Sequence, residues 1–151
     1  MYRLYTEQQI PISLKEAWDF FSSPKNLKTL TPDYMGFEIT STFFDEKMYP
    51  GQLISYKVKP LLSIPLNWVT EITHVIDHKY FVDEQRFGPY AMWHHEHHFQ
   101  ENEKGVLMTD IVHYKLNWYM GGPITNTLIV KGQLKKIFDY RYQKINELFK
   151  S

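Results

Sequence analysis

Residues 81–99 read FVDEQRFGPYAMWHHEHHF and hold four of the seven histidines of the chain. Two alternating runs interrupted by a Gly-Pro pair predict two strands joined by a tight turn. Successive side chains on a strand point to opposite faces. His95 and His97 therefore share one face, and His94 and His98 share the other. The strand period divides the histidine cluster into two pairs.

The turn also sets the register of these two strands. With Pro89 at its centre, Asp83 lies opposite His95, and directly opposed residues share a face. A slip of one residue would put Glu84 on the side of His95 and reverse the assignment. On the preferred register, a carboxylate accompanies the two histidines.

Outward from this hairpin, further alternating segments predict a sheet. Short polar or Gly/Pro-containing turns separate them, and parallel strands would need much longer connections. We expect a seven-stranded antiparallel sheet in which the six strands from Phe37 onward form a meander; the strands are Tyr2 to Ile10, Phe37 to Phe43, Gln52 to Lys59, Asn67 to Ile76, Tyr80 to Arg86, Ala91 to Gln100 and Val106 to Leu116.

Three segments have helical patterns. Ser13 and Glu16 form a capping box ahead of a helix from Leu14 to Ser22, and Pro24 begins a short helix that ends at Leu30. A long amphipathic helix is predicted from Pro123 to Phe149. Its expected apolar face is Ile124, Leu128, Leu134, Ile137, Phe138, Tyr142, Ile145, Leu148 and Phe149, and its expected solvated face is Lys135, Lys136, Arg141, Lys144 and Lys150.

The order of the elements predicts an α+β fold in one domain, residues 1–151. A curved antiparallel sheet needs a cover for its inner face. Only the last helix is long enough, at about 40 Å for its length at about 1.5 Å per residue. We expect the sheet to wrap around this helix, with the two short helices closing one end.

Composition narrows the class of protein. Lys plus Arg and Asp plus Glu number 17 each, so no net positive charge favours nucleic acid. The absence of cysteine excludes disulfides and thiolate sites and fits the cytoplasm. No apolar run is long enough for stable membrane insertion. Zero net charge gives little protection against self-association, so a homodimer remains among the expected partners.

Four strings carry a family resemblance: W-x-T-x-I from Trp68, F-V-D-E-Q from Phe81, G-P-Y-x-x-W-x-H-x-H-x-F from Gly88, and T-D-x-V-x-Y from Thr109. With the order of elements, they resemble the helix-grip fold of the START and Bet v 1-like superfamily, also called SRPBCC, and within it a small bacterial ligand-binding branch. The resemblance implies a cavity between the sheet and the long helix that holds a small hydrophobic or amphipathic molecule. No catalytic signature of the enzyme members is matched.

We therefore expect a binding protein that is not an enzyme, with no cofactor. One alternative is an enzyme resembling polyketide cyclases and dehydratases that uses His95, His97 and Asp83; another is an interaction protein with a filled interior. Strand parity and the large aromatic side chains select the expected ligand-binding wall: Trp68, Thr70, Phe81, Asp83, Gln85, Trp93, His95, His97, Phe99, Asp110 and Tyr114.

The inner histidines admit four interpretations. They form a satisfied network with Asp83 and Asp110, contact a polar group of a ligand, bind a metal ion, or transfer protons. A metal is the weakest of these, because two histidines are a weak signal and His113 has the wrong parity to be a third. We expect no metal.

Overall fold

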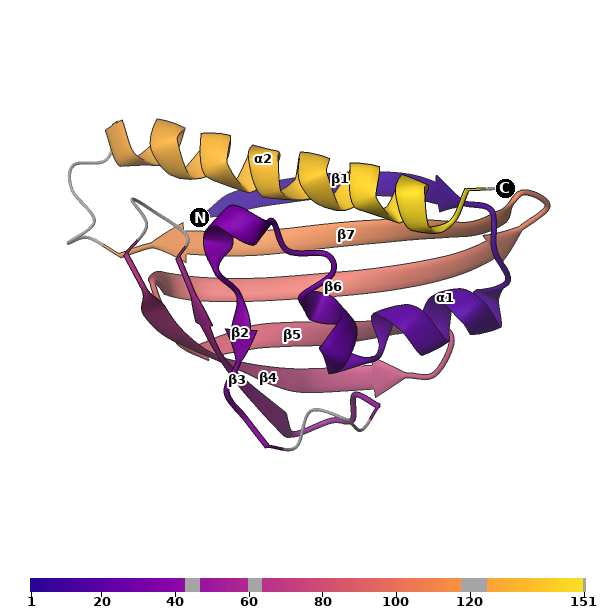
Figure 1. The fold of residues 1–151 in the computed structure, drawn as a ribbon, viewed down its shortest axis with the longest axis horizontal. Coiled ribbons are helices and arrows are strands. Elements are labelled where there is room, and N and C mark those ends of the chain that lie inside the picture. Colours follow the sequence, from indigo (N-terminus) through magenta and orange to yellow (C-terminus); the bar gives the residue numbers. More distant parts are fainter. Residues whose placement is uncertain (43–46, 60–63, 118–124, 151) are drawn as a thin grey trace.

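The computed structural model describes residues 1–42, 47–59, 64–117 and 125–150. The seven predicted strands form one antiparallel sheet in the order β1-β7-β6-β5-β4-β3-β2. The sheet is curved, and its helices lie on one face (Figure 1). Its strands are β1 (Tyr2–Ile10), β2 (Glu38–Ile39), β3 (Gln52–Val58), β4 (Leu66–Ile76), β5 (Tyr80–Phe87), β6 (Tyr90–Asn102) and β7 (Gly105–Leu116).

β2 is shorter than predicted. The amides of Thr40 and Ser41 both donate to the carbonyl of Ser55, so the chain leaves the regular ladder after two residues. Residues 43–46 and 60–63, which follow the second and third strands, lie outside the described residues.

The helices are α1 (Leu14–Phe21), two 3₁₀ helices, η1 (Pro24–Leu27) and η2 (Asp33–Met35), and α2 (Thr125–Leu148). The predicted capping box is present: the amide of Glu16 donates to Ser13 Oγ, and the Glu16 carboxylate accepts from the amide of Ser13. η1 is shorter than the predicted helix and η2 was not predicted. The predicted start of α2 at Pro123 lies outside the described residues.

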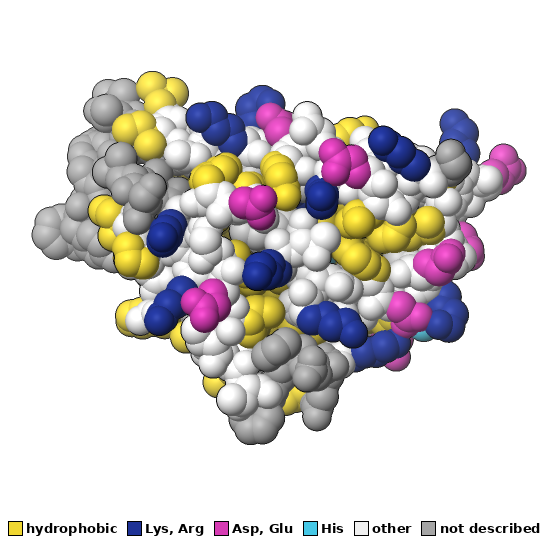
Figure 2. All heavy atoms as spheres, in the orientation of Figure 1, with side chains coloured by type: hydrophobic (Ala, Val, Ile, Leu, Met, Phe, Trp, Pro, Cys, Tyr) yellow, Lys and Arg dark blue, Asp and Glu magenta, His cyan; other side chains and the backbone are white. Residues whose placement is uncertain are grey.

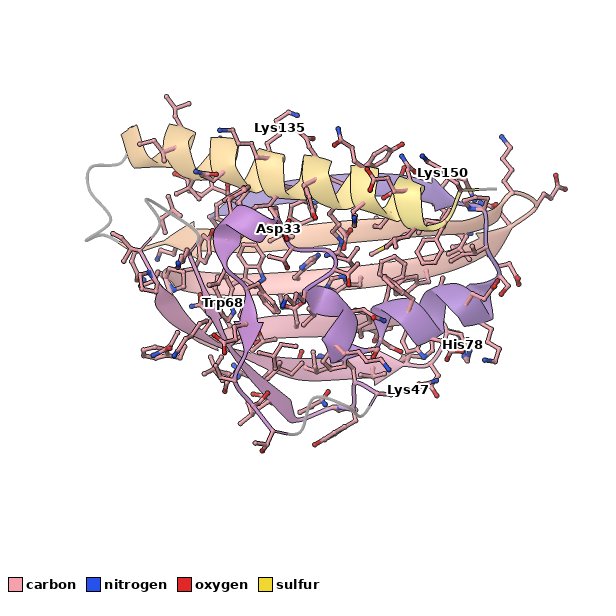
Figure 3. The ribbon with its side chains drawn as sticks, viewed as in Figure 1. Asp33, Lys47, Trp68, His78, Lys135 and Lys150 are labelled. Atoms are coloured by element: carbon pink, nitrogen blue, oxygen red, sulfur yellow. The ribbon has the colours of Figure 1, made fainter. Side chains whose placement is uncertain are left out.

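α2 lies lengthwise across the inner side of the sheet and packs against β1, whereas α1 packs against β6 and β7 (Figure 1). The buried face of α2 carries Val130, Leu134, Phe138 and Ile145. Leu128, Tyr142 and Leu148, expected on that face, are exposed, because the helix turns a narrower stripe toward the sheet. Lys135 and Lys150 point away from the sheet, as predicted (Figure 3).

None of the helices in the described ranges has the length and apolar content of a membrane-spanning segment. On the face seen in Figure 2, basic and acidic side chains are interspersed among apolar ones.

Candidate functional site

A pocket of about 170 Å³ lies between the curved sheet, the short helices and α2. Most of its wall is apolar, and it ends at a group of titratable side chains. Seven residues of the predicted wall line it: Trp68, Thr70, Phe81, Asp83, Trp93, His95 and His97.

Four residues of the predicted wall lie elsewhere. The Gln85 amide bridges the β5–β6 turn by donating to the carbonyl of Tyr90 and accepting from its amide. Phe99 packs against Trp18 and Phe21 near α1. In both cases the side chain has the predicted parity but lies past an end of the pocket.

Tyr114 and Asp110 also lie outside the pocket lining. Tyr114 packs between Tyr2 and Trp93 in an aromatic cluster beside the pocket. Asp110 lies behind the histidines, in a second cleft of about 290 Å³ between β1 and α2. Several lining residues were not predicted from the sequence, among them Tyr56, Tyr90, Phe138 and Arg141.

The predicted register of the histidine strand is correct. Asp83 pairs with His95 across β5 and β6, and His97 pairs with Asp110 across β6 and β7. These pairings place two carboxylates, one from each neighbouring strand, on either side of the inner histidines. The side chains of His95 and His97 are 6% and 5% exposed, so these two rings are largely withdrawn from water.

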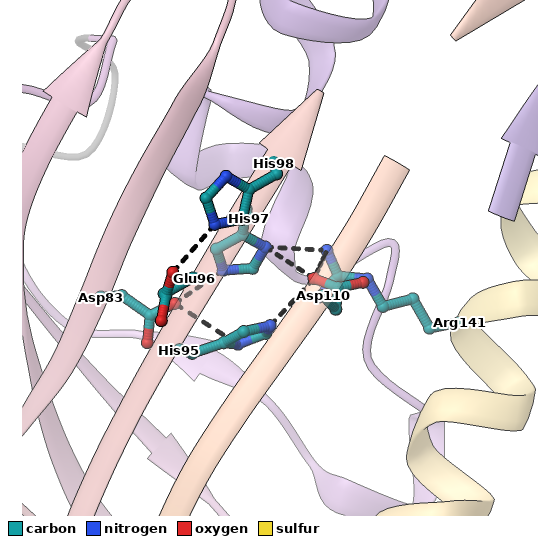
Figure 4. A network of polar contacts seen from close by, with 7 residues as sticks. All are labelled: Asp83, His95, Glu96, His97, His98, Asp110 and Arg141. Atoms are coloured by element: carbon teal, nitrogen blue, oxygen red, sulfur yellow. Dashed lines mark hydrogen bonds and ion pairs between the residues drawn. The ribbon is translucent and has the colours of Figure 1, made fainter. Parts of the chain in front are cut away.

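The four side chains form a closed ring of contacts (Figure 4). Asp110 Oδ1 is 2.9 Å from His95 Nε2 and 2.9 Å from His97 Nδ1. Asp83 Oδ2 is 2.8 Å from His97 Nε2 but 3.5 Å from His95 Nδ1. Three of the four contacts are therefore of hydrogen-bond length, and one is longer.

With both carboxylates ionised, these distances indicate which ring nitrogens carry protons. An ionised carboxylate can only accept, so each nitrogen at hydrogen-bond distance from one carries a proton. His97 then has two N–H groups and is an imidazolium. His95 has one, on Nε2, and its Nδ1 keeps a lone pair at the longer contact.

The direction of each pKa shift agrees with this assignment. Burial lowers the pKa of His97, but its hydrogen bonds to Asp110 and Asp83 outweigh burial and raise the pKa above its usual value. Burial and the neighbouring His97 charge lower the pKa of His95. Burial raises the pKa of both carboxyls, but other contacts outweigh it. At Asp83 the hydrogen bond from His97 lowers the pKa. At Asp110 the Arg141 charge and both histidines hold the pKa well below its usual value.

Arg141 corrects the prediction of a solvated face on α2. Its side chain is only 14% exposed, and Nη2 lies 3.7 Å from Asp110 Oδ1 and 3.4 Å from His97 Nδ1. Arg141 follows Phe138 by three positions and precedes Ile145 by four, so it is on the buried stripe. Its charge and that of the His97 imidazolium balance the two carboxylates.

The outer histidines contact carboxylates at the surface. His94 Nδ1 is 2.8 Å from a Glu84 oxygen, and His98 Nε2 is 2.9 Å from a Glu96 oxygen. Their side chains are 30% and 40% exposed. The predicted outward orientation of this pair is correct.

His74 has the parity of Trp68 on β4 but is exposed. A register shift between Ile72 and His74 inserts an extra residue, which reverses the alternation along the rest of the strand. No third histidine therefore reaches the inner group from β4.

Comparisons with known proteins agree on the fold. A structure of a protein from Mycobacterium smegmatis has a TM-score of 0.69 and 15% identity, with 97% of this chain and 89% of that chain covered. For a Nitrosomonas europaea protein the values are 0.70 and 13%, covering 98% and 94%. Ara h 8.0201, a Bet v 1 homologue, has a TM-score of 0.63 and 11% identity, covering 97% and 98%.

The chain has the Bet v 1-like helix-grip fold. At these identities the helix-grip likeness shows the fold alone. Neither the protein-family models nor the curated proteins include a match to the sequence.

Two polar atoms around the helix-grip pocket lack a hydrogen-bond partner among the described residues. Trp68 Nε1 and Arg141 Nε are both buried, and both residues line the pocket. A buried N–H without an acceptor costs about 1–3 kcal/mol. The pocket wall therefore holds unused donors.

Proposed function

We propose that the protein binds a small amphipathic molecule in the pocket between the sheet and α2, without transforming it. The observation that carries this proposal is an apolar pocket that ends at one polar group of side chains. Ligand sites typically combine such a wall with a few convergent polar groups.

The volume of the pocket limits the size of the molecule. A dry apolar cavity of about 150 Å³ is enough to hold benzene. The pocket measures about 170 Å³ and has the rings of Trp68, Trp93 and Phe81 in its wall. A compound with one flat ring fits this space, whereas a long-chain lipid would require the pocket to widen.

The unused donor indicates one feature of the ligand. Trp68 Nε1 is buried without a partner among the described residues, and its ring forms part of the pocket wall. After a small rotation of the indole toward the pocket, a carbonyl or ether oxygen on the ligand would accept from this N–H and remove the cost of leaving it unpaired.

A matched pair of ligands tests the proposal. Acetophenone and ethylbenzene have similar shapes, but only acetophenone has an acceptor oxygen. We expect wild-type protein to bind acetophenone about tenfold more tightly, which corresponds to about 1.4 kcal/mol for one hydrogen bond. Binding is measured by calorimetry or by chemical-shift changes of the pocket residues.

Trp68→Phe keeps an aromatic ring and removes the donor, so it should bind both compounds equally. If wild-type protein binds neither compound, and native mass spectrometry of protein purified from cells shows no carried molecule, the proposal is wrong. Equal affinities in wild-type protein would remove the role of Trp68 alone.

One observation favours a second candidate, an enzyme acting on a carbonyl compound. His95 Nδ1 is 3.5 Å from Asp83 Oδ2, the longest of the four contacts in the group, and His95 lines the pocket beside Asp83 and the charged His97. A free imidazole nitrogen can act as a base. Here His95→Gln would abolish turnover of a bound substrate while leaving its affinity intact; a binding protein shows no turnover to lose.

We propose that the protein is located in the cytoplasm and has no nucleic-acid partner. The assembly to test is a homodimer. On the face seen in Figure 2, charges of both signs are interspersed, which supports the absence of a nucleic-acid surface there.

A further inference from the structure

We propose that Asp83, His95 and His97 bind a divalent transition-metal ion at the polar end of the pocket. The ion would be Zn²⁺ or one of similar size and ligand preference, such as Co²⁺. This inference does not depend on the organic ligand proposed above.

The three side chains converge on one point. Each offers one ligand atom, and these atoms all lie within 4.8 Å of one another. Asp83 Oδ2 is 3.5 Å from His95 Nδ1 and 2.8 Å from His97 Nε2. An ion with bonds of about 2.1 Å separates its ligand atoms by about 3.0 to 3.4 Å. The two spacings that involve Asp83 lie on either side of this range, and the histidine rings, whose centroids are 3.7 Å apart, must open to bind one ion.

Asp110 orients both histidines for this role. The nitrogens that face away from Asp83, His95 Nε2 and His97 Nδ1, are each 2.9 Å from the same Asp110 oxygen. Protons held there leave the facing nitrogens available as ligands. A carboxylate behind a ligating histidine is a regular feature of metal sites, because it fixes the tautomer and the ring orientation. Here one carboxylate serves two histidines, and Arg141 approaches it from α2.

The surrounding contacts hold the rings in place. Phe81 stacks on His97 with 4.2 Å between ring centroids and 20° between planes, and the two histidine rings are 3.7 Å apart. These contacts limit how far each ring can move, and limited freedom before binding lowers the ordering cost of binding.

Only one proton has to leave. His95 Nδ1 already has a lone pair, so the incoming ion displaces the proton of His97 Nε2 and the charge it carries. Two imidazoles and one carboxylate, with no sulfur, suit Zn²⁺, Fe²⁺, Co²⁺ or Ni²⁺. Asp83, His95 and His97 line the pocket, whereas Asp110 lies behind them. The remaining coordination positions of the ion therefore face the pocket.

From the sequence, Asp83 or Asp110 could complete a set of three ligands, but a metal was the weakest interpretation because no third histidine shares this face. The structure supplies the third ligand as a carboxylate from the neighbouring strand. No other group of this kind is found in the part of the chain that the structure describes.

The test is a titration of chelator-treated protein with Co²⁺ alone, followed by visible absorption, with Zn²⁺ as competitor. We expect saturation at one ion per chain and displacement by Zn²⁺. Changes behind a metal ligand cost about 10–100-fold in affinity, so losing a ligand in Asp83→Asn or His95→Gln should cost about 100-fold or more.

The strand provides its own matched control. His94→Gln/His98→Gln removes two histidines from the same strand but from the outer face, and should leave Co²⁺ affinity within about twofold of wild type, because neither side chain is a ligand. Wild-type protein that shows no saturable Co²⁺ binding would overturn the proposal. So would loss of binding in the control variant, since the ion would then be on the outer face.

If the ligand variants fail to fold, a measurement on wild-type protein still tests the proposal. On Zn²⁺ addition, nitrogen-detected NMR of the imidazoles should shift His95 Nδ1 and His97 Nε2 most, because these two become ligands. Shifts confined to His94 and His98 would contradict the proposal, as would equal changes at all histidines.

Discussion

The two faces of β6 carry the same chemistry in opposite surroundings. On the inner face His97 Nε2 lies 2.8 Å from Asp83, and on the outer face His94 Nδ1 lies 2.8 Å from Glu84. The side chains of the inner pair are 5% and 17% exposed, and those of the outer pair 30% and 29%. The distances are equal, so the difference between the pairs comes from burial.

Burial changes what each pair requires. An exposed ion pair is worth about 0.2–1 kcal/mol, because water and salt compete with it. A buried pair must be balanced, since a single uncompensated charge in the interior costs several kcal/mol. The inner group meets this condition with two carboxylates, Arg141 and one imidazolium. Loss of any one charge of the inner group should therefore lower the free energy of unfolding far more than a comparable loss on the outer face of β6.

The largest effect is expected for Asp110→Asn. This change keeps the shape of the side chain but leaves Arg141 and His97 facing a single remaining carboxylate. We expect a loss of about 3–5 kcal/mol in the free energy of unfolding, measured by urea denaturation of chelator-treated protein.

The control for Asp110→Asn is Glu84→Gln, which removes the outer carboxylate that contacts His94. Its expected cost is below about 1 kcal/mol. Equal losses in the two variants would show that burial does not distinguish the faces.

The second effect concerns Arg141, the charge contributed by α2. Arg141→Met fills similar space and leaves Asp110 with the histidines alone. The expected loss is about 1.5–3 kcal/mol, the range for hydrogen bonds to charged groups. Lys144→Met is the matched change on the same helix: Lys144 contacts Glu147 at 3.4 Å on the surface, and its loss should cost less than about 1 kcal/mol. A larger loss for Lys144→Met would contradict the assignment of Arg141 to the inner group.

The inner group could be predicted wherever the two-residue period of a strand alone determines which side chains share a face. Parity separated His95 and His97 from His94 and His98, and the position of the turn placed Asp83 opposite His95. Both inferences rest on the geometry of an uninterrupted hairpin.

Prediction failed where local geometry departs from the regular pattern. The bulge before His74 adds one residue to β4, and nothing in that segment marks it. Gln85 has the right parity, but its amide reaches the backbone of the turn instead of the pocket.

Arg141 is a different case, because the signal was present. It lies three residues after Phe138 and four before Ile145, on the stripe that the sheet covers. A rule that assigns charged residues to the surface overrode helical spacing. The spacing was the better guide because a buried carboxylate, Asp110, provides a partner for the charge.

The pH dependence of stability sharpens the comparison further. The pKa of His97 is raised in the folded protein, so its contribution is full below the usual imidazole value of about 6.5 and is lost as pH rises through the folded pKa. The pKa of Asp83 and Asp110 is lowered, so their contributions are lost as pH falls. We expect urea denaturation of chelator-treated protein to show a decline above neutral pH with a slope of up to about 1.4 kcal/mol per pH unit.

His97→Gln should remove this alkaline decline, because the titrating group is gone. His98→Gln should keep it, since His98 is on the outer face. A decline that persists unchanged in His97→Gln would assign the alkaline loss to another group.

The smallest effect is expected for Glu96→Gln, which removes the carboxylate shared by His94 and His98 on the outer face. Its cost at low salt should be below about 1 kcal/mol. At about 1 M salt the screening length falls to about 3 Å, so this cost should disappear, while that of Asp110→Asn should persist because ions do not enter the buried group. Urea denaturation of both variants at low and high salt measures the difference. A cost of Glu96→Gln that is independent of salt would mean that the outer carboxylate stabilises the strand by packing or by a specific hydrogen bond rather than by charge.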